Sequence, residues 1–289
     1  MSEHADKDKV GEELAAQRFQ MLEDIARELA GEVVFPTCFD TVLRLRKELQ
    51  NPNLTISHIA HVVSVEPLIA AKLLRLANSA VYAAHGKSVV DLPSAINRLG
   101  LNIVRATALA IAMTQILHAK DMAAYSHVAR SLWDHSIRSA VGARLLAHTY
   151  TRINPEEALL AGLVHDLGAF YMLYRATQYP ELRERPDTVK HLIMQWHEGI
   201  GVTLLETLGL PEEIVQASVD HDHPRTVSEI PKTLADIVYI SNILAGAHYE
   251  WLYQDFDPQA VAFTAIHEKY AGVLPELEVL AREMRSVLT

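Results

Sequence analysis

The sequence predicts an all-α protein, a multi-helix bundle, on three observations. Apolar residues recur at helical spacing along nearly every segment, and no stretch sustains the two-residue alternation of a half-buried strand. Only 12 of the 289 residues are glycine, about 4% against a usual ~7%, so the tight turns of a β-sandwich or barrel are scarce. Hydrophobic residues make up 49% of the chain, enough to bury a core in one or two domains.

The first part of the chain contains recognisable helix starts and stops. Thr55 can cap one helix, and Pro67 suits the first position of the next, because the N–H that proline lacks has no partner there. Gly100 is a natural residue for a helix end. Helices are expected over residues 8–30, from Phe39 to Leu49, from Thr55 to Val63, from Pro67 to Ala77, over 92–100 and, almost wholly apolar, over 101–118.

The second part begins its helices with equally clear signals. Asn154-Pro155-Glu156-Glu157 combines a capping Asn with Pro at the first helical position and Glu behind it. A helix starting at Leu210-Pro211 is expected to end in His221-Asp222-His223. No linker rich in Pro, Gly or Ser separates the two parts, which predicts two packed helical halves. Helices are expected over residues 128–150, from Pro155 to His165, over about 187–208, 211–223 and 232–250, from Pro258, and at the C-terminus around Leu277 to Met284.

The composition excludes several classes of protein. A net charge of −10 disfavours general binding to nucleic acid or to anionic membranes, which needs clustered Lys and Arg. The single cysteine, Cys38, rules out an internal disulfide framework and a CxxC zinc site. The longest apolar run, Ala106–Leu117, is shorter than a membrane span, and the polar N-terminus shows no signal peptide. We therefore expect a cytoplasmic protein that does not bind membranes.

Side chains of metal-ligand type stand on separate predicted helices of the second part. Imidazole and carboxylate groups converging from several helices are how bundles build metal sites, and the mixture suits Fe, Mn or Zn. His165 and Asp166 lie 100° apart on a straight helix, but both can turn to one centre at a helix end, and Gly168 permits that departure. The candidate ligands are His135, His165, Asp166, His197, His221 and Asp236, with Asp222 and His223 beside His221.

Each candidate also has a structural interpretation. Asp166 can accept backbone N–H groups at a helix end, with His165 packed beside it. His135 and His197 can be buried in the core, and Asp236 can cap a helix or lie on the surface. His221 and His223 can interact as cations with the negative end of a helix dipole.

Five blocks of sequence carry a resemblance to a known family. The second part contains WDHSIRSAVGARLLA, EEALLAGLVHDLGAF and WHEGIGVTLLETLGLPEEIVQASVDHDHP, and the first part contains RLANSAVY and LPSAINRLGLNIVRATALA. Together they resemble the HDOD domain, the HD-related output domain of bacterial signalling proteins, within the HD phosphohydrolase superfamily. The resemblance covers about residues 33–225. It divides the chain into an N-terminal helix (1–32), an N-terminal helical half (33–118), an HD-like helical half (119–225) and a C-terminal extension (226–289).

The resemblance implies an all-α fold, a role in signal output and, from the wider superfamily, metal-dependent phosphohydrolase chemistry. The matched ligands are His135, His165, Asp166, His197, His221 and Asp236, with Asp166 as the bridging ligand and His165 and Asp166 as the catalytic pair. Two departures count against catalysis. The branch that hydrolyses cyclic dinucleotides has Lys where this chain has Ala169, and its GYP motif has no counterpart here.

Two functions therefore stay open from the sequence, beside a third and lower interpretation as a purely structural helical scaffold. The leading interpretation is a regulatory module that binds a signalling protein partner or a small ligand, with an HD-type metal site that is either retained or vestigial. The alternative is an active metal-dependent phosphohydrolase acting on a phosphoester or a cyclic nucleotide. Residues 68–117 carry five basic side chains against one acid, Asp91. This segment either faces a phosphorylated ligand or an acidic partner, or is an ordinary solvated surface.

Overall fold

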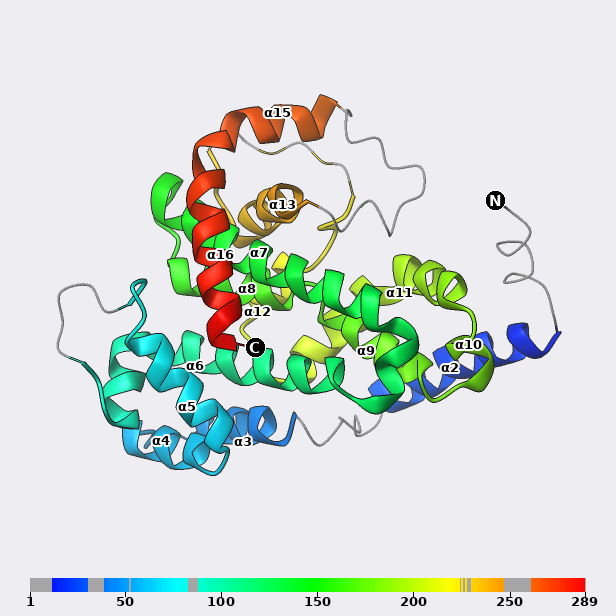
Figure 1. Ribbon diagram of the computed structural model, residues 1–289, viewed down its shortest axis with the longest axis horizontal. Helices are drawn as coiled ribbons and strands as arrows, with labels where there is room; N and C mark the ends of the chain where they lie inside the picture. Colours follow the sequence, from blue (N-terminus) through cyan, green and yellow to red (C-terminus); the bar gives the residue numbers. More distant parts are fainter. Residues whose placement is uncertain are drawn as a thin grey trace.

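The part of the chain that the structure describes consists mainly of helices joined by irregular segments. The computed structural model describes residues 12–30, 39–51, 53–82, 88–223, 225, 227, 230–246 and 261–288. These residues form α-helices and short 3₁₀ helices and contain no strand, which confirms the predicted all-α fold (Figure 1). Cys38 lies outside the described residues.

The first half contains five helices among its described residues, close to those expected. The Asp91 carboxylate accepts the backbone N–H of Ser94 and caps the last of them. Gly100, with φ of 78°, breaks this helix, so the two helices expected on either side of it are two limbs of one element. The five are α2 (Glu12–Ala30), α3 (Asp40–Leu49), α4 (Ile56–Ser64), α5 (Pro67–Ala77) and α6 (Leu92–Leu117).

The second half differs from expectation at two helix ends and in α9 (Leu167–Ala176) and α10 (Pro180–Arg183), two helices that were not expected. The helix begun at Pro211 ends at Ala217, so His221 and Asp222 follow it in an irregular segment in which Asp220 has φ of 53°. The helix expected over 232–250 ends at Ala245 among the described residues. The elements are η2 (Lys120–Tyr125), α7 (Ser126–Tyr150), α8 (Pro155–Val164), α9 (Leu167–Ala176), α10 (Pro180–Arg183), α11 (Pro186–Thr207), α12 (Glu212–Ala217), α13 (Leu234–Ala245), α15 (Val261–Tyr270), η3 (Ala271–Val273) and α16 (Leu274–Leu288).

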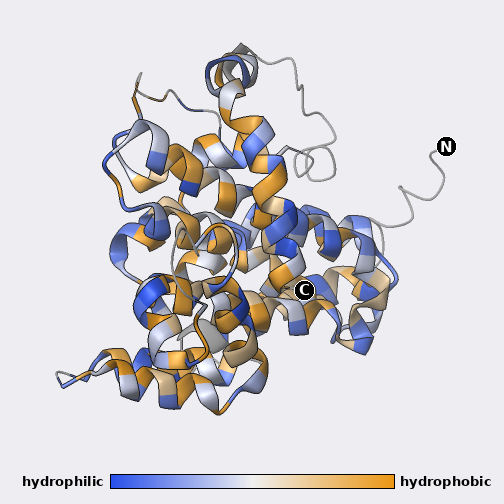
Figure 2. Ribbon diagram, turned by 60° about the vertical axis from the view of Figure 1, so that its left-hand side comes forward, coloured by the Kyte–Doolittle hydropathy of each residue, from blue (hydrophilic) through white to orange (hydrophobic). Residues whose placement is uncertain are grey.

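Helix α7 is the centre of the packing. It contacts α8, α13 and α16 directly, and α6 lies between this group and α3 to α5 (Figure 1). The helices turn their apolar sides toward one another and their polar sides outward (Figure 2). In the described part of the chain, α6 is the one helix long and apolar enough to span a membrane, but 67% of its apolar window is buried inside the protein. Helix α6 therefore serves as a core helix.

Helix α16 joins the two halves through its last carbonyl groups. The buried Lys72 ammonium on α5 donates to Val287 O at 2.9 Å, and the Arg75 guanidinium donates to Ser286 O at 3.1 Å. Cations at the C-terminal end of a helix satisfy its unpaired carbonyls and favour its dipole. Two of the basic residues of segment 68–117 therefore have a structural role.

Replacing Leu73 with Ala is expected to lower the free energy of unfolding by roughly 2–5 kcal/mol, because a fully buried Leu on α5 loses its packing and leaves a cavity. Chemical denaturation measures the change. Leu68→Ala on the same helix is the control: Leu68 is 43% exposed, and the substitution is expected to cost less than about 0.5 kcal/mol. Equal effects of the two substitutions would show that the buried face of α5 is assigned wrongly.

Candidate metal centre

A buried carboxylate, Asp166, lies between two pairs of histidines. Asp166 separates α8 from α9, and its side chain is fully buried. Its Oδ2 faces one pair of imidazoles and its Oδ1 faces the other. Five of the six predicted ligands therefore meet at one place, brought there from α7, the α8–α9 junction, α11 and the segment after α12.

The first pair consists of His135 on α7 and His165 at the end of α8. Their Nε2 atoms lie 3.3 Å apart. The Asp166 Oδ2 atom is 3.7 Å from His135 Nε2 and 3.3 Å from His165 Nε2. Three ligand atoms thus surround one point, all of them buried.

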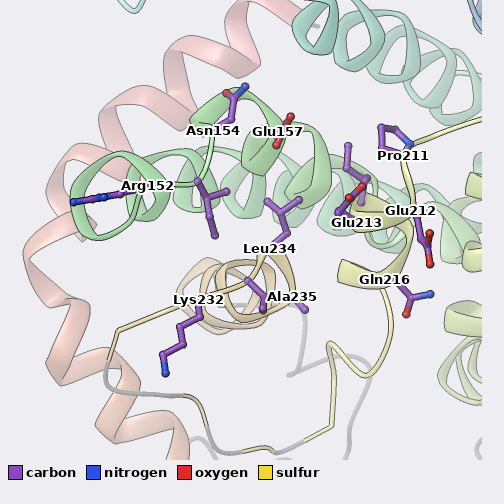
Figure 3. A pocket seen from close by; sticks show the side chains of 13 residues that line it. Arg152, Asn154, Glu157, Pro211, Glu212, Glu213, Gln216, Lys232, Leu234 and Ala235 are labelled. Carbon is purple, nitrogen blue, oxygen red and sulfur yellow. The ribbon is translucent and has the colours of Figure 1, made fainter.

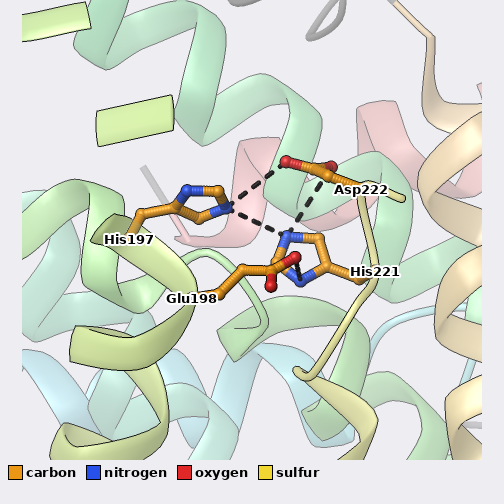
Figure 4. Close-up of side chains that lie close together, drawn as sticks. All are labelled: His197, Glu198, His221 and Asp222. Carbon is orange, nitrogen blue, oxygen red and sulfur yellow. Dashed lines mark hydrogen bonds and ion pairs between the residues drawn. The ribbon is translucent and has the colours of Figure 1, made fainter. Parts of the chain in front are cut away.

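The second pair consists of His197 on α11 and His221 after α12, again with the Nε2 atoms 3.3 Å apart. Asp166 Oδ1 is 3.1 Å from His221 Nε2 and 3.7 Å from His197 Nε2. The Asp222 carboxylate adds Oδ2 at 3.3 Å from His197 Nε2 (Figure 4). This group has two imidazoles and two carboxylates, and Glu198 stands beside it.

All four imidazoles are oriented by backbone carbonyls. The Nδ1 atoms of His165, His197 and His221 lie 2.7–2.9 Å from the carbonyls of Gly162, Ile193 and Ser218, and His135 Nδ1 lies 3.2 Å from Gly246 O. A carbonyl only accepts, so each Nδ1 carries the proton, and in the neutral imidazole each Nε2 presents its lone pair. Such second contacts fix the tautomer of metal-bound histidine.

The distances between these atoms fit a cation in each group. Two lone pairs facing each other at 3.3 Å repel unless a proton or a metal ion lies between them. Two nitrogens 3.3 Å apart, each about 2.1 Å from one ion, subtend about 104° at that ion, near the tetrahedral angle. The donor atoms present are therefore compatible with one metal ion in each group.

The electrostatics of the second group also favour a cation. Burial lowers the pKa of His221, but the carboxylates of Asp222, Asp166 and Glu198 outweigh it and raise that pKa to about 10. Burial likewise lowers the pKa of His197, and Asp222, with a smaller contribution from Asp166, raises it above its usual value. The carboxylates thus hold positive charge in this group, either as protons on the imidazoles or as a metal ion in their place.

Two glycines allow the helices to approach closely enough for the histidines to meet. A Cβ atom on Gly168 would lie 2.0 Å from His197 O, and one on Gly162 would lie 2.7 Å from Ser139 O. Gly168 therefore sets the approach of α9 to α11, and Gly162 sets that of α8 to α7. Gly168 is not where the chain leaves the helix, as the sequence suggested: it lies inside α9, and the break is at His165-Asp166.

Helix α13 supports the centre from outside. The buried Asn242 amide donates to His221 O and to Asp222 Oδ1, both at 3.0 Å. These bonds leave Asp222 Oδ2 facing His197. Asp222 was named from the sequence only as a neighbour of His221, because His-Asp-His does not show which of its members turn inward.

The structure does not bring Asp236 to the centre. Its carboxylate accepts the N–H groups of Lys232 and Thr233 and forms a capping box at the start of α13, with Arg225 at 3.7 Å. This is the structural interpretation that the sequence left open for Asp236.

Two pockets in the described part of the chain differ in their relation to the centre. A pocket of about 420 Å³ is lined by Met194, Gln195, Trp196, His197, Glu198 and His223. It includes His197 of the second group and Glu198 beside that group. A larger pocket of about 850 Å³ lies where α8, α12 and α13 begin and includes none of the five gathered ligands (Figure 3).

Comparison with known families and sequences identifies relatives of this chain. A family model for the HDOD domain matches residues 35–224. Among curated proteins, an uncharacterized protein of Treponema pallidum (strain Nichols) is 23% identical over 243 residues, which are 79% of this chain and 45% of that protein. The chain thus spans less than half the length of this relative.

Several solved structures share the fold. A proposed metal-dependent phosphohydrolase of Shewanella amazonensis is 20% identical with a TM-score of 0.62, over 88% of this chain and 99% of that one. An HDOD domain protein of unknown function from Geobacter sulfurreducens has a TM-score of 0.56 at 19% identity, over 95% and 98%. A proposed signal transduction protein of Marinobacter aquaeolei has a TM-score of 0.54 at 20% identity, over 94% of this chain and 64% of that one. At these identities the likeness concerns the fold.

Gly168→Ala is expected to force α9 and α11 apart, because the new methyl group would overlap His197 O. We expect a loss of at least about 1–3 kcal/mol in the free energy of unfolding and weaker metal binding, measured by thermal denaturation and elemental analysis. Gly199→Ala on α11 is the matched control, since a Cβ there meets nothing within 4 Å. Unchanged stability and metal content in Gly168→Ala would contradict this role.

Proposed function

The chain belongs to the HDOD domain family, and from that premise we propose that its buried centre binds two divalent metal ions and hydrolyses a phosphoester. One observation carries the proposal: the two oxygens of Asp166 face two separate histidine pairs, each with its Nε2 atoms 3.3 Å apart. A carboxylate between two sets of imidazoles is the arrangement expected of a bridging ligand in a two-metal site.

The ligands divide into two sets. The first ion would be held by His135, His165 and Asp166 Oδ2. The second would be held by His197, His221 and Asp166 Oδ1, together with Asp222. Mixed imidazole and carboxylate ligands suit Fe, Mn or Zn.

Bound metal ions in such a site acidify a water molecule and neutralise the charge of a phosphoryl group. The protein's own residues orient the metal-binding side chains for that chemistry. The backbone carbonyls keep the protons of the imidazoles on Nδ1, and Asn242 holds Asp222 in place. Glu198 lies at the edge of the second group, with one oxygen 3.6 Å from His221 Nδ1 and 3.8 Å from His223 Nδ1.

The proposal does not extend to cyclic dinucleotides. The branch that cleaves them has a Lys where this chain has Ala169, which is fully buried within α9. No charged side chain is available from that position, so a substrate phosphate would depend on the metal ions and on other side chains for its neutralisation.

A second candidate function is a regulatory module that reports occupancy of the centre to a signalling protein partner. It is favoured by the contacts that lead outward from the ligands. His135 faces Gly246 O at the end of α13, and Arg138, one turn along α7, donates to Ala245 O and pairs with Glu278 on α16. The last turn of α16 in turn accepts a hydrogen bond from Lys72 of the N-terminal half. A change in the position of the ligands can therefore be transmitted through these contacts to both halves.

Purified protein is expected to hold close to two metal ions per chain after reconstitution with Fe, Mn or Zn. Asp166→Ala should remove both ions while the helical circular dichroism stays unchanged, because one oxygen is lost from each group. Elemental analysis measures the metal content. Asp236→Asn is the control and should retain both ions, since its carboxylate acts at a helix cap. Metal that persists in Asp166→Ala would contradict the bridging role.

Metal affinity is expected to rise with pH. A metal binds only deprotonated Nε2, and the pKa of His221 is raised to about 10 with that of His197 also raised. Protons therefore compete with the metal ions for these Nε2 atoms at neutral pH, where a histidine with the ordinary pKa of about 6.5 would already be mostly deprotonated. Calorimetric titration in buffers of different ionisation enthalpy should show proton release that accompanies binding. An affinity independent of pH would mean that the ions bind elsewhere.

The two candidate functions differ in turnover. The metal-loaded protein is expected to release inorganic phosphate from phosphomonoesters, and Asp166→Ala is expected to abolish that release. Metal binding without hydrolysis of any phosphoester would favour the regulatory candidate. Wild-type protein that binds no metal after reconstitution would contradict the phosphohydrolase.

A further inference from the structure

Next to the second histidine pair lies a pocket whose lining differs from the centre itself. The pocket of about 420 Å³ formed by Met194–Glu198 and His223, called here the α11 pocket, is within the usual size range for a small-molecule site. It includes His197 of the second group and Glu198 beside that group. A molecule bound in the α11 pocket therefore lies beside the proposed metal centre.

Trp196 is the unusual residue of this pocket. Its side chain is 50% exposed, although it is the largest apolar side chain of α11 and adjoins a buried ligand. Tryptophan offers a flat ring that stacks on other rings, and such exposed aromatic residues are typical of recognition sites. Met194 lines the same pocket and supplies a polarisable sulfur that also packs well on aromatic rings.

The charges around the α11 pocket determine which part of a ligand it can accept. The carboxylates of Asp166, Asp222 and Glu198 surround the second group, and Asp220 lies 3.7 Å from His223 Nδ1 at the rim. These groups repel a phosphate in the α11 pocket, whereas the metal ions proposed for the centre would attract it. The carboxylates do not repel an uncharged ring, which can therefore bind beside Trp196.

We propose that the α11 pocket is a subsite for a planar aromatic ring carried by the phosphorylated ligand, and that Trp196 stacks on this ring and determines the preference for it. The inference rests on the proposed function, since the phosphate end is placed by the metal centre. It goes further by naming the substrate class: phosphate esters that bear an aromatic ring rather than an aliphatic group. Gln195, Glu198 and His223 supply hydrogen-bonding groups at the edge of the pocket.

Phosphonates test the subsite without turnover, because their carbon–phosphorus bond is not a phosphoester. The metal-loaded chain of 289 residues is titrated calorimetrically with phenylphosphonate, cyclohexylphosphonate and methylphosphonate. We expect phenylphosphonate to bind more tightly than cyclohexylphosphonate of similar size. Trp196→Leu should weaken phenylphosphonate by roughly 5- to 100-fold and leave methylphosphonate unchanged, whereas Trp196→Phe should restore part of the loss.

Phe19→Leu is the control, because Phe19 is 70% exposed on α2 and does not line the pocket. Trp196 is half exposed, so its replacement should leave the melting temperature and metal content unchanged. Metal-dependent binding of methylphosphonate combined with identical affinities in wild type and Trp196→Leu would overturn the ring subsite and leave the metal centre standing. Absence of metal-dependent binding of every phosphonate would overturn both.

Discussion

The buried centre of the second half is organised around one carboxylate, Asp166, whose side chain is closed off from bulk solvent. An ionised carboxylate is costly to bury unless opposite charge or hydrogen-bond donors compensate for it. Here the compensation must come from positive charge, as protons on Nε2 or as bound metal ions, at four imidazoles, two at each oxygen. These imidazoles reach Asp166 from α7, the end of α8, α11 and the segment after α12. The packing of these elements is therefore coupled to the charge state of one residue. Positive charge at this point, as protons or as metal ions, offsets the cost of burying the carboxylate.

That requirement explains the small residues around the centre. Helices with ordinary side chains at their contact lie 8–10 Å apart, and glycine removes the side chain that would hold them at a greater distance. Gly162 and Gly168 stand at the α7–α8 and α9–α11 contacts, and a methyl group at either position would overlap a backbone carbonyl of the facing helix. The close α7–α8 contact brings the first histidine pair together, and the close α9–α11 contact brings α11 with His197 of the second pair toward Asp166. The distance between the helix backbones therefore determines the distance between the ligands.

Much of this architecture could be predicted from the sequence, because helical periodicity and capping residues are local signals. The helices around Thr55, Pro67, Asn154 and Pro186 begin within a residue or two of expectation. Five of the six proposed ligands meet, since the resemblance matched them to positions on separate helices. Asp236 could not be assigned in this way, because a carboxylate three residues after Thr233 has the same local pattern as a capping box, which it forms. The early end of α12 and the inward turn of Asp222 depend on the φ of 53° at Asp220 and on Asn242, neither of which has a sequence signature. The basic residues of 68–117 were equally ambiguous, because the partner of Lys72 is 215 residues away.

That separation between Lys72 and its partner has a consequence for how the protein is made. Lys72 is buried only when the last carbonyls of α16 accept its ammonium group. At about 5–20 residues per second, the ribosome adds Val287 some 10 to 40 s after Lys72, since 215 residues separate them. During that interval the end of α5 keeps a solvated cation, and the surface that α16 later covers is open. The N-terminal half therefore emerges from the ribosome without the helix that covers α5. The two halves complete their packing only when α16 has been synthesised.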